Sequence, residues 1–481
     1  MEDSLVRGWP ASTVVRWTEL HRLAVAGREA VIARHVGRRV AQAWLRRSRF
    51  ADVAALANAT LTLGPDAGAL YDLGWAQFST GQPRQALASY EQALRLYREV
   101  GNRGGEAATL NNIGGVYDGL GDRQQALTYF EQALLIQREV GDRVGEAATL
   151  SNIGLVHDGL GNLQQALTYF QQALLIQREV GERVGEATTL NNIGLVHDGL
   201  GDRQQALTYF QQALPIQRVI GDRVGEATTL TNIGGVYNGL GDRRQALTYF
   251  EQALPIQREV GNRAGEAATL NNIGLTYNGL GDRRQALTYF QQALPIQREV
   301  GNRVGEATTL NNIGHVHDGL GERQQALTYF EQALPIQREV GDRVGEATTL
   351  TNIGHVHDGL GERQQALTYF EQALPIRREV GDRVGEATTL NNIGAIRFQQ
   401  DDLAGAKEAL GEVLEVFRVT GDRGSEATAE FNMAAVLWRM AQVEDAIGCQ
   451  RRAVVLAEET SHPALDQMRA FLIDLKRARE G

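Results

Sequence analysis

Cysteine, lysine and proline are scarce in this chain of 481 residues. The one cysteine, Cys449, excludes an intramolecular disulfide framework and a CxxC zinc site, and it favours a reducing compartment. The two lysines, Lys407 and Lys476, lie outside any glycine-rich loop of the kind that binds nucleotide phosphates, so that class of NTPase site is excluded. The remaining 46 basic residues are arginine, a bias that suggests a GC-rich, bacterial genome.

Long apolar runs are also missing. The first ten residues, MEDSLVRGWP, begin acidic and show no signal peptide, and no stretch approaches the ~18 apolar residues of a membrane span. With 43% hydrophobic and 22% charged residues, the composition is that of a globular protein. We therefore expect a cytoplasmic protein without a membrane partner.

A forty-residue repeat dominates the chain. Residues 101–380 are seven near copies, such as GDRVGEATTLTNIGHVHDGLGERQQALTYFEQALPIRREV at 341–380. The period continues, degraded, over 61–100, 381–420 and 421–460. Five columns of the seven copies are always glycine and account for 35 of the 54 glycines. A fixed period of this length is the signature of a repeat architecture.

Each copy predicts two helices. Apolar residues recur every three or four positions in both halves of 101–140, which favours amphipathic helices near 103–119 and 123–139. Gly121 breaks the pattern before an Asp122-x-x-Gln125 capping box, and Gly141 supplies a left-handed residue after the second helix. Because neither helix buries its apolar face alone, successive pairs must stack into an α-solenoid.

The constant residues of the repeat resemble the tetratricopeptide repeat (TPR). In block 101–140 they are Leu110, Ile113, Gly114, Tyr117, Gly121, Ala126, Phe130 and Ala133. The resemblance covers ten repeats over 61–460. It implies an all-α, right-handed α-solenoid in which Gly114 lets the two helices of a repeat pack closely, and a concave groove, lined by the first helices, that binds a peptide or protein. It implies no catalysis and no cofactor.

Two features refine the resemblance. The closing proline of the family is absent, and the six extra residues GDRxGE resemble the longer repeats of kinesin light chains and Pins-type spindle scaffolds. Near-identical copies also resemble the arrays attached to bacterial STAND-type NTPases and CHAT proteases, in signalling or defence systems. No such effector is present in this chain.

The flanks are expected to cap the array. Residues 1–60 carry a net charge of +5 and include a degenerate repeat, whereas the rest of the chain is acidic. Residues 461–481 place Leu465, Met468, Leu472 and Leu475 on one stripe of a capping helix. The predicted domains are therefore a cap at 1–60, an array at 61–460 and a C-terminal capping helix at 461–481.

Variation among the copies concentrates at positions 111, 115 and 118, which lie on one face of the first helix. By the resemblance, this face lines the groove. Its predicted peptide-binding residues are Asn111, Asn191, Asn271, Asn311, Leu155, Leu195, His315 and His355. Neutral drift on a solvated face is the alternative.

A column of asparagines beside this face does not vary. An amide side chain offers donor and acceptor together, which suits an extended peptide backbone, and the resemblance implies the same role. The column is preceded by Asp72 and continues to Asn432; its predicted binding members are Asn112, Asn152, Asn192, Asn232, Asn272, Asn312, Asn352 and Asn392. The alternative is a ladder of amides that joins adjacent first helices.

An acidic column lies near the C-terminal end of the first helix, where the helix dipole disfavours an anion. It comprises Asp118, Asp158, Asp198, Asp318 and Asp358. The functional hypothesis is a negative groove that attracts a basic partner, and the alternative is pairing with Arg123 and its equivalents across the turn. We expect no nucleic acid partner.

Other patterns carry less chemistry. His157, His197, His317 and His357 replace the repeat's tyrosine and predict packing rather than a metal site, since His315 and His317 point to different sides of the helix. Arg103 and Glu106 indicate a solvated ion-pair ladder. The prolines within the second helices predict kinks; they are Pro215, Pro255, Pro295, Pro335 and Pro375.

The sequence thus predicts a non-enzymatic interaction scaffold or sensor arm that binds a peptide, basic in character or held by its backbone. A self-associating structural solenoid, hence a homo-oligomer, is the alternative. No nucleophile, general base or metal constellation supports an enzyme.

Overall fold

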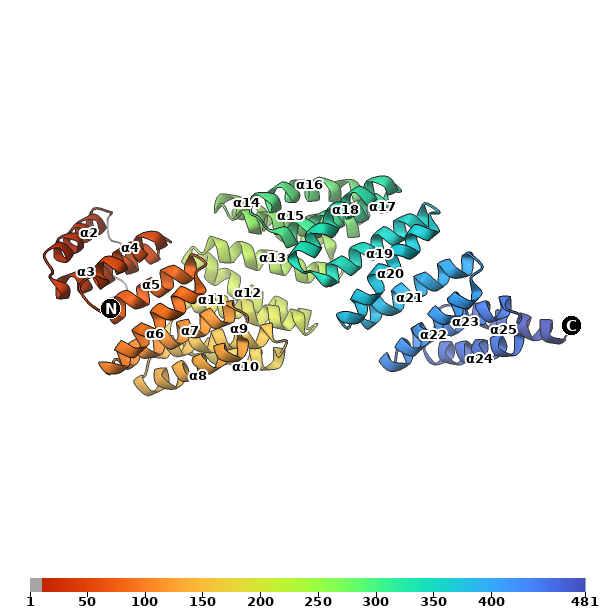
Figure 1. The fold of residues 1–481 in the computed structure, drawn as a ribbon, viewed down its shortest axis with the longest axis horizontal. Helices are drawn as coiled ribbons and strands as arrows, with labels where there is room; N and C mark the ends of the chain where they lie inside the picture. The colour runs from red at the N-terminus through yellow and green to blue at the C-terminus, as the bar shows by residue number, and fades with distance from the viewer. Residues whose placement is uncertain (1–10, 481) are drawn as a thin grey trace. The chain divides into compact units, whose positions relative to one another are not determined.

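A computed structural model describes residues 11–480, which form 24 helices and no strand (Figure 1). The chain divides into two compact units, Met1–Leu240 and Gly241–Gly481. In the part of the chain that the structure describes, no helix has the length and apolarity needed to cross a membrane. The all-α solenoid of stacked helix pairs is therefore confirmed within each unit.

The first unit contains α2 to α13. Their bounds are α2 Ala11–Ala26, α3 Ala30–Leu45, α4 Phe50–Leu61, α5 Ala67–Ser79, α6 Pro83–Glu99, α7 Arg103–Gly119, α8 Arg123–Val140, α9 Arg143–Gly159, α10 Leu163–Val180, α11 Arg183–Gly199, α12 Arg203–Ile220 and α13 Arg223–Gly239.

The second unit contains α14 to α25. Their bounds are α14 Arg243–Glu259, α15 Arg263–Gly279, α16 Arg283–Glu299, α17 Arg303–Gly319, α18 Arg323–Val340, α19 Arg343–Gly359, α20 Arg363–Glu379, α21 Arg383–Gln399, α22 Leu403–Thr420, α23 Arg423–Arg439, α24 Val443–Glu459 and α25 Leu465–Glu480.

The helix boundaries expected for block 101–140 are confirmed to within one residue by α7 and α8. The Asp122 carboxylate accepts a hydrogen bond from the backbone N–H of Gln125 at 3.2 Å, so the predicted N-cap forms. Gly121 and Gly141 have φ of 83° and 71°, in the left-handed region that ends a helix cheaply only at glycine. The starts and ends of the repeat's helices are thus set by local interactions that can be identified from the sequence.

The close packing expected at Gly114 is also confirmed. A Cβ at this position would lie 2.7 Å from the ring of Phe130, which belongs to the second helix of the same repeat and is 2% exposed. Phe170 lies in the same way over Gly154. A side chain on this column would separate the two helices, so glycine here sets the distance between them.

Glu106 corrects the expectation of a solvated ion-pair ladder. It is only 6% exposed, and it accepts hydrogen bonds from Arg98 of the preceding repeat at 2.8 Å and from Arg103 at 2.5 Å. Arg103 also reaches Glu139 at 2.6 Å. The equivalent buried carboxylates are Glu146, Glu186, Glu226, Glu266, Glu306, Glu346 and Glu386. Each one accepts hydrogen bonds from arginines of two successive repeats and so joins their helices.

The helices run through the internal prolines without interruption. α12 continues from Arg203 to Ile220 although Pro215 lies inside it, and α16 continues past Pro295. The side chain at the same position in α8, Leu135, is 70% exposed, so the proline ring lies on the solvent side of the helix rather than in the core. The kinks, and a change of curvature along the array, stay predictions.

The C-terminal capping helix is α25, which packs on α24. Met468 and Leu475 of the predicted stripe are each 1% exposed, and Gln450 of α24 donates a hydrogen bond to the Met468 carbonyl at 2.7 Å. At the other end, α4 ends at Leu61, beside the boundary predicted at residue 60. The domain limits at 60 and 460 themselves stay predictions.

Candidate functional site

The first helices of successive repeats form one face within each unit. Besides its neighbour in the chain, α7 packs on α9, α9 on α11, and α15 on α17, and all such packing between alternate helices involves first helices or α3. We call the positions equivalent to 111, 112, 115 and 118 the first-helix face. The predicted binding residues all lie on it and are half-buried or exposed, so the structure brings them together as columns across neighbouring repeats.

The asparagine ladder, which the sequence left as an alternative, exists at four places. Asn152 donates a hydrogen bond from its side-chain amide to Asn111 at 3.1 Å, and Asn232 donates to Asn191 at the same distance. In the second unit Asn312 donates to Asn271 at 3.3 Å, and Asn432 donates to Asn391 at 3.4 Å. All four acceptors are asparagines at position 111 or its equivalents. The residue at this variable position therefore determines whether the bond between adjacent repeats can form.

The remaining asparagines differ in their partners. Asn112 donates to the Tyr90 hydroxyl at 3.3 Å, and Asn392 lies 3.3 Å from Nε2 of His355. Asn311 donates to Thr349 at 2.6 Å. Asn192 follows a repeat that carries Ser151 where the ladder needs asparagine, so it has no amide partner of that kind. The first-helix face therefore contains both structural and uncommitted amides; Asn272 and Asn352 lie half-buried on it as well.

A hollow of about 390 Å³ lies between α9, the end of α10 and α11. Asn152 and Asn192 line it from two successive first helices, and Leu155 lies beside them with 45% of its surface exposed. Thr188 adds a hydroxyl. The hollow thus combines amide donors and acceptors with an exposed aliphatic side chain, the combination that holds a peptide backbone and packs one of its side chains.

Position 115 is exposed wherever it carries a large side chain. Leu195 is 43% exposed, and His315 and His355 also reach solvent. The ring of His355 packs edge-on against Phe370, with 5.2 Å between ring centroids. This column is the part of the first-helix face whose side chains differ most from one repeat to the next.

The acidic column is half-buried. Arg203 lies 3.8 Å from Asp198, so the pair across the turn that was the alternative forms in one repeat. Arg123 instead lies next to Gly159 of the following repeat, where a Cβ would come within 2.9 Å of its guanidinium. Burial raises the pKa of Asp158 above its usual range. Asp118, Asp318 and Asp358 lie in the same half-buried position.

The histidines that replace tyrosine pack as predicted. His157 and His317 stack on Tyr169 and Tyr329 with centroids 5.3 Å apart, in the same way as Tyr117 stacks on Tyr129. His317 also lies 2.6 Å from a carboxylate oxygen of Glu322. Within residues 11–480, no three His, Cys, Asp or Glu side chains lie where they could hold a metal ion together.

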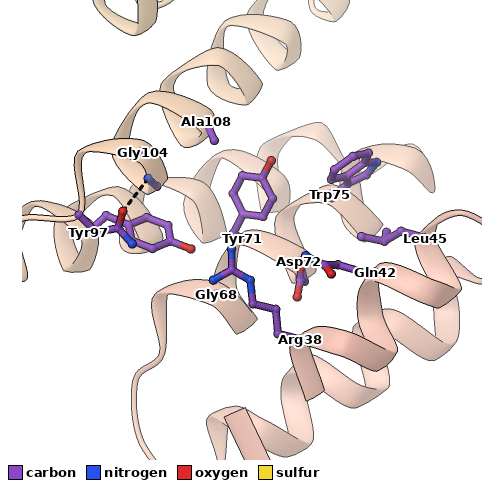
Figure 2. A pocket seen from close by; sticks show the side chains of 12 residues that line it. Arg38, Gln42, Leu45, Gly68, Tyr71, Asp72, Trp75, Tyr97, Gly104 and Ala108 are labelled. Atoms are coloured by element: carbon purple, nitrogen blue, oxygen red, sulfur yellow. Dashed lines mark hydrogen bonds between the residues drawn. The ribbon is translucent and has the colours of Figure 1, made fainter. Parts of the chain in front are cut away.

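A second hollow of the first unit, about 290 Å³ in volume, lies between α3, α5 and the start of α7 (Figure 2). Asp72 takes the place of the asparagine column there and is 6% exposed. Burial raises its pKa to about 7, although Arg38 opposes the shift. Tyr71 and Trp75 form an aromatic wall, with ring centroids 6.2 Å apart. Sequence comparison places Asp72 at the head of the column, but it does not show that Arg38 shares its hollow.

A third hollow, about 310 Å³, lies in the second unit, where the repeat's phenylalanine is replaced by Leu410. A Cβ at Gly394 would be 3.5 Å from Leu410, in ordinary contact rather than in collision as at Gly114. Asn391 and Asn432 lie at this hollow and Phe398 replaces the acidic residue of the column. The signal in the sequence is the loss of Phe from a column that is otherwise constant in the seven copies.

Comparison with known proteins assigns the repeat. A family model described as tetratricopeptide repeat matches residues 105–178, 159–218, 225–299, 305–379 and 385–459, and a second model with the same description matches 67–100. No curated protein matches the chain.

Two solved structures illustrate the likeness of fold. A Signal Transduction ATPase with Numerous Domains (STAND) protein with a tetratricopeptide repeat sensor, from Pyrococcus horikoshii, is 14% identical with a TM-score of 0.57; the match covers 76% of this chain and 55% of that one. The apo form of the quorum sensor NprR from B. thuringiensis is 17% identical with a TM-score of 0.50, over 75% of this chain and 99% of that one.

Proposed function

This chain belongs to the tetratricopeptide repeat family, and from that premise we propose that it is a non-enzymatic scaffold or sensor arm that binds an extended peptide or protein segment along its first-helix face. The observation that carries the proposal is the hollow between α9 and α11, where Asn152, Asn192 and Leu155 meet. Two of the similar proteins are sensors by name, the STAND protein with a tetratricopeptide repeat sensor and the quorum sensor NprR, which accords with this role.

The amides support recognition of backbone rather than of sequence. A half-buried asparagine can donate to a peptide carbonyl and accept from a peptide N–H without reading a side chain. Asn152 uses its side-chain amide for the hydrogen bond to Asn111. The preceding repeat of Asn192 has Ser151 at the position of Asn111, so Asn192 forms no such bond to an asparagine. We therefore assign peptide binding first to Asn192 and its surroundings, and selectivity to the exposed residues at position 115.

The acidic column supports a partner of basic character. Asp158 is half-buried and its pKa is raised by burial, so a cation placed beside it would recover favourable electrostatic energy. The regular first helices carry no lysine or arginine beyond their first turn, so the cations needed to hold an acidic peptide are missing from the face.

The test compares three fluorescein-labelled random peptide pools of equal length, rich in lysine, rich in glutamate or uncharged, by fluorescence anisotropy. We expect the lysine-rich pool to bind the intact chain most tightly, with an affinity that weakens as salt is raised. Equal affinities for all three pools would contradict the basic preference, and no binding to any pool would contradict the proposal itself.

Two asparagine variants separate binding from folding. Asn192→Ala should weaken peptide binding about fivefold or more, the loss of one or two hydrogen bonds, and leave thermal unfolding unchanged. Asn232→Ala, which removes the bond to Asn191, serves as the matched variant and should lower stability as well. Unchanged binding by Asn192→Ala would remove this residue from the site. Sedimentation of the free chain as a monomer excludes self-association as the source of the signal.

A further inference from the structure

The hollow between α3, α5 and α7 holds two charged side chains that do not pair with each other. The Asp72 carboxylate is 6% exposed and has no hydrogen-bond partner among residues 11–480. Arg38 lines the same hollow from α3 (Figure 2), and its charge opposes the effect of burial on the pKa of Asp72 although the two side chains form no ion pair within residues 11–480. A buried carboxylate without a bonded cation or donor is unfavourable in its charged form, so either a proton or the cationic group of a ligand stabilises it.

The walls of the hollow are aromatic and amide groups. Tyr71 and Trp75 line it from α5 and Tyr97 from α6, and Trp75 is 42% exposed. Gln42 of α3 adds a side-chain amide. Figure 2 shows the Tyr71 and Trp75 rings above Asp72 and Arg38, so the two charges form the base of a pocket with an apolar wall.

These residues depart from the repeat at the positions where the pocket needs them. In the regular copies, the position of Tyr71 holds Asn, Ser or Thr. The position of Asp72 holds Asn, and the position of Trp75 holds Gly, Leu or His. Arg38 comes from the basic N-terminal segment, outside the regular array. The combination of cation, anion and aromatic rings therefore belongs to this end of the first unit and is not repeated along the chain.

We propose that this pocket binds a small zwitterion, an α-amino acid with an apolar side chain, through its ammonium group on Asp72, its carboxylate on Arg38 and its side chain against Tyr71 and Trp75. The volume of about 290 Å³ accommodates such a molecule; a dry cavity of ~150 Å³ is enough for benzene. The site is independent of peptide binding on the regular first helices.

Electrostatics favours a ligand that carries both charges. A simple cation would meet Arg38 as well as Asp72, and a simple anion would meet Asp72 as well as Arg38. The other ionisable groups near Asp72 are Asp66, Tyr71, Tyr90 and Tyr97, and burial raises the pKa of each of the three tyrosines, so they remain neutral at pH 8. At that pH Asp72 is ionised, because burial raises its pKa only to about 7.

The experiment titrates the full chain with L-phenylalanine at pH 8 by isothermal titration calorimetry, with tryptophan emission as a second readout because Trp75 lines the pocket. Phenethylamine lacks the carboxylate and 3-phenylpropionate lacks the ammonium. We expect both analogues to bind at least about tenfold more weakly than phenylalanine, the effect of losing one charge-assisted contact. If no saturable binding heat is observed up to ~10 mM phenylalanine, the binding free energy is weaker than ~3 kcal/mol, and this result would overturn the proposal.

Variants assign the two ends of the ligand. Asp72→Asn restores the residue type that this column carries in the other repeats, so the chain should fold, and it should weaken phenylalanine about tenfold while leaving 3-phenylpropionate no weaker. Arg38→Gln should also weaken phenylalanine binding, but it should leave the binding of phenethylamine, which lacks the carboxylate, no weaker. Arg95→Gln, on exposed surface of α6, is the charge-matched control and should change nothing. Phenylalanine binding that survives both pocket variants would place the ligand elsewhere and overturn the assignment.

Discussion

At the scale of single residues, substitutions within otherwise constant columns carry most of the information. Where the asparagine column has aspartate, at Asp72, a carboxylate is buried next to Tyr71 and Trp75. Where the phenylalanine column has leucine, at Leu410, the contact with Gly394 loosens and a hollow opens. Near-identical repeats thus provide an internal reference. Each substitution can be compared with the other copies, in which the same position is packed or hydrogen-bonded.

Asp72→Asn should also change the pH dependence of stability. The folded pKa of Asp72 is about 7, above its ordinary value of 3.8, so between these values the folded chain holds a proton that the unfolded chain releases. Stability therefore falls as pH rises from about 4 to above 7. The Asp72→Asn variant escapes this loss, so it should match the wild type near pH 4 and exceed it near pH 8 by one to a few kcal/mol, at about 1.4 kcal/mol for each pKa unit.

Hydrogen exchange of α5, followed by mass spectrometry at pH 5 and pH 8 after correction for the intrinsic exchange rate, measures this difference locally. Asp118→Asn is the control for removing a negative charge from the same face, since Asn238 and Asn278 occupy that column naturally. A difference between wild type and Asp72→Asn that is the same at both pH values would contradict the prediction.

At the scale of helices, the contacts that join repeats are more polar than the amphipathic pattern suggests. Glu146 accepts hydrogen bonds from Arg138 of α8 at 2.8 Å and from Arg143 of α9 at 2.5 Å. Burial alone would raise its pKa, but the two arginines outweigh this effect and hold the pKa below its usual range. The contribution of this cluster to stability is therefore present above about pH 4.5 and is lost as the pH falls through the lowered pKa.

Glu146→Gln should weaken the junction between α8 and α9. It leaves two arginines without their shared carboxylate, and since both arginines are about half exposed the loss should be ~1–3 kcal/mol, below that of a fully buried pair. Glu179→Gln is the matched control, because Glu179 also binds Arg143 but is 61% exposed, and it should change stability by less than ~0.5 kcal/mol. Hydrogen exchange of α9 at pH 7 gives both values, and equal effects would show that burial of Glu146 contributes nothing.

At the scale of the whole molecule, the helices within each unit pack against their neighbours in the chain, and several first helices also pack against the next first helix. Stability in such an array is close to a sum of local terms, without contacts between distant repeats. The chain forms two units of similar size; in the first, α2 packs on α3, and α3 and α4 pack on each other and on α5, and in the second α25 packs on α24. The hollow between α9 and α11 and the hollow at Asp72 lie at different places along the first unit and are lined by different residues.

Fragments 1–260 and 261–481, divided between two repeats, should therefore each fold. We expect both to give helical circular dichroism spectra whose sum reproduces that of the intact chain, since every helix keeps most of its neighbours. Each fragment should unfold cooperatively on heating, at a temperature somewhat below that of the intact chain. A fragment without helical structure would show that the array needs its full length.

The sequence by itself determined the repeat, the helix boundaries and the first-helix face, because these depend on features that recur every three or four residues or every forty. Gly121, Gly141 and the cap at Asp122 act within one turn of chain, so they can be identified without a structure. The columns of candidate binding residues were equally predictable, since position on a helix fixes the face.

Only the tertiary structure decided what those residues contact. The bond from Asn152 to Asn111, the burial of Glu106 and the approach of Arg38 to Asp72 each join side chains from different helix pairs. Such contacts depend on the distance and offset between stacked repeats, which no local pattern encodes. For this reason the sequence could state only that the asparagines form either a ladder or a binding surface. The structure shows the ladder at four places, and binding by the other asparagines stays a prediction.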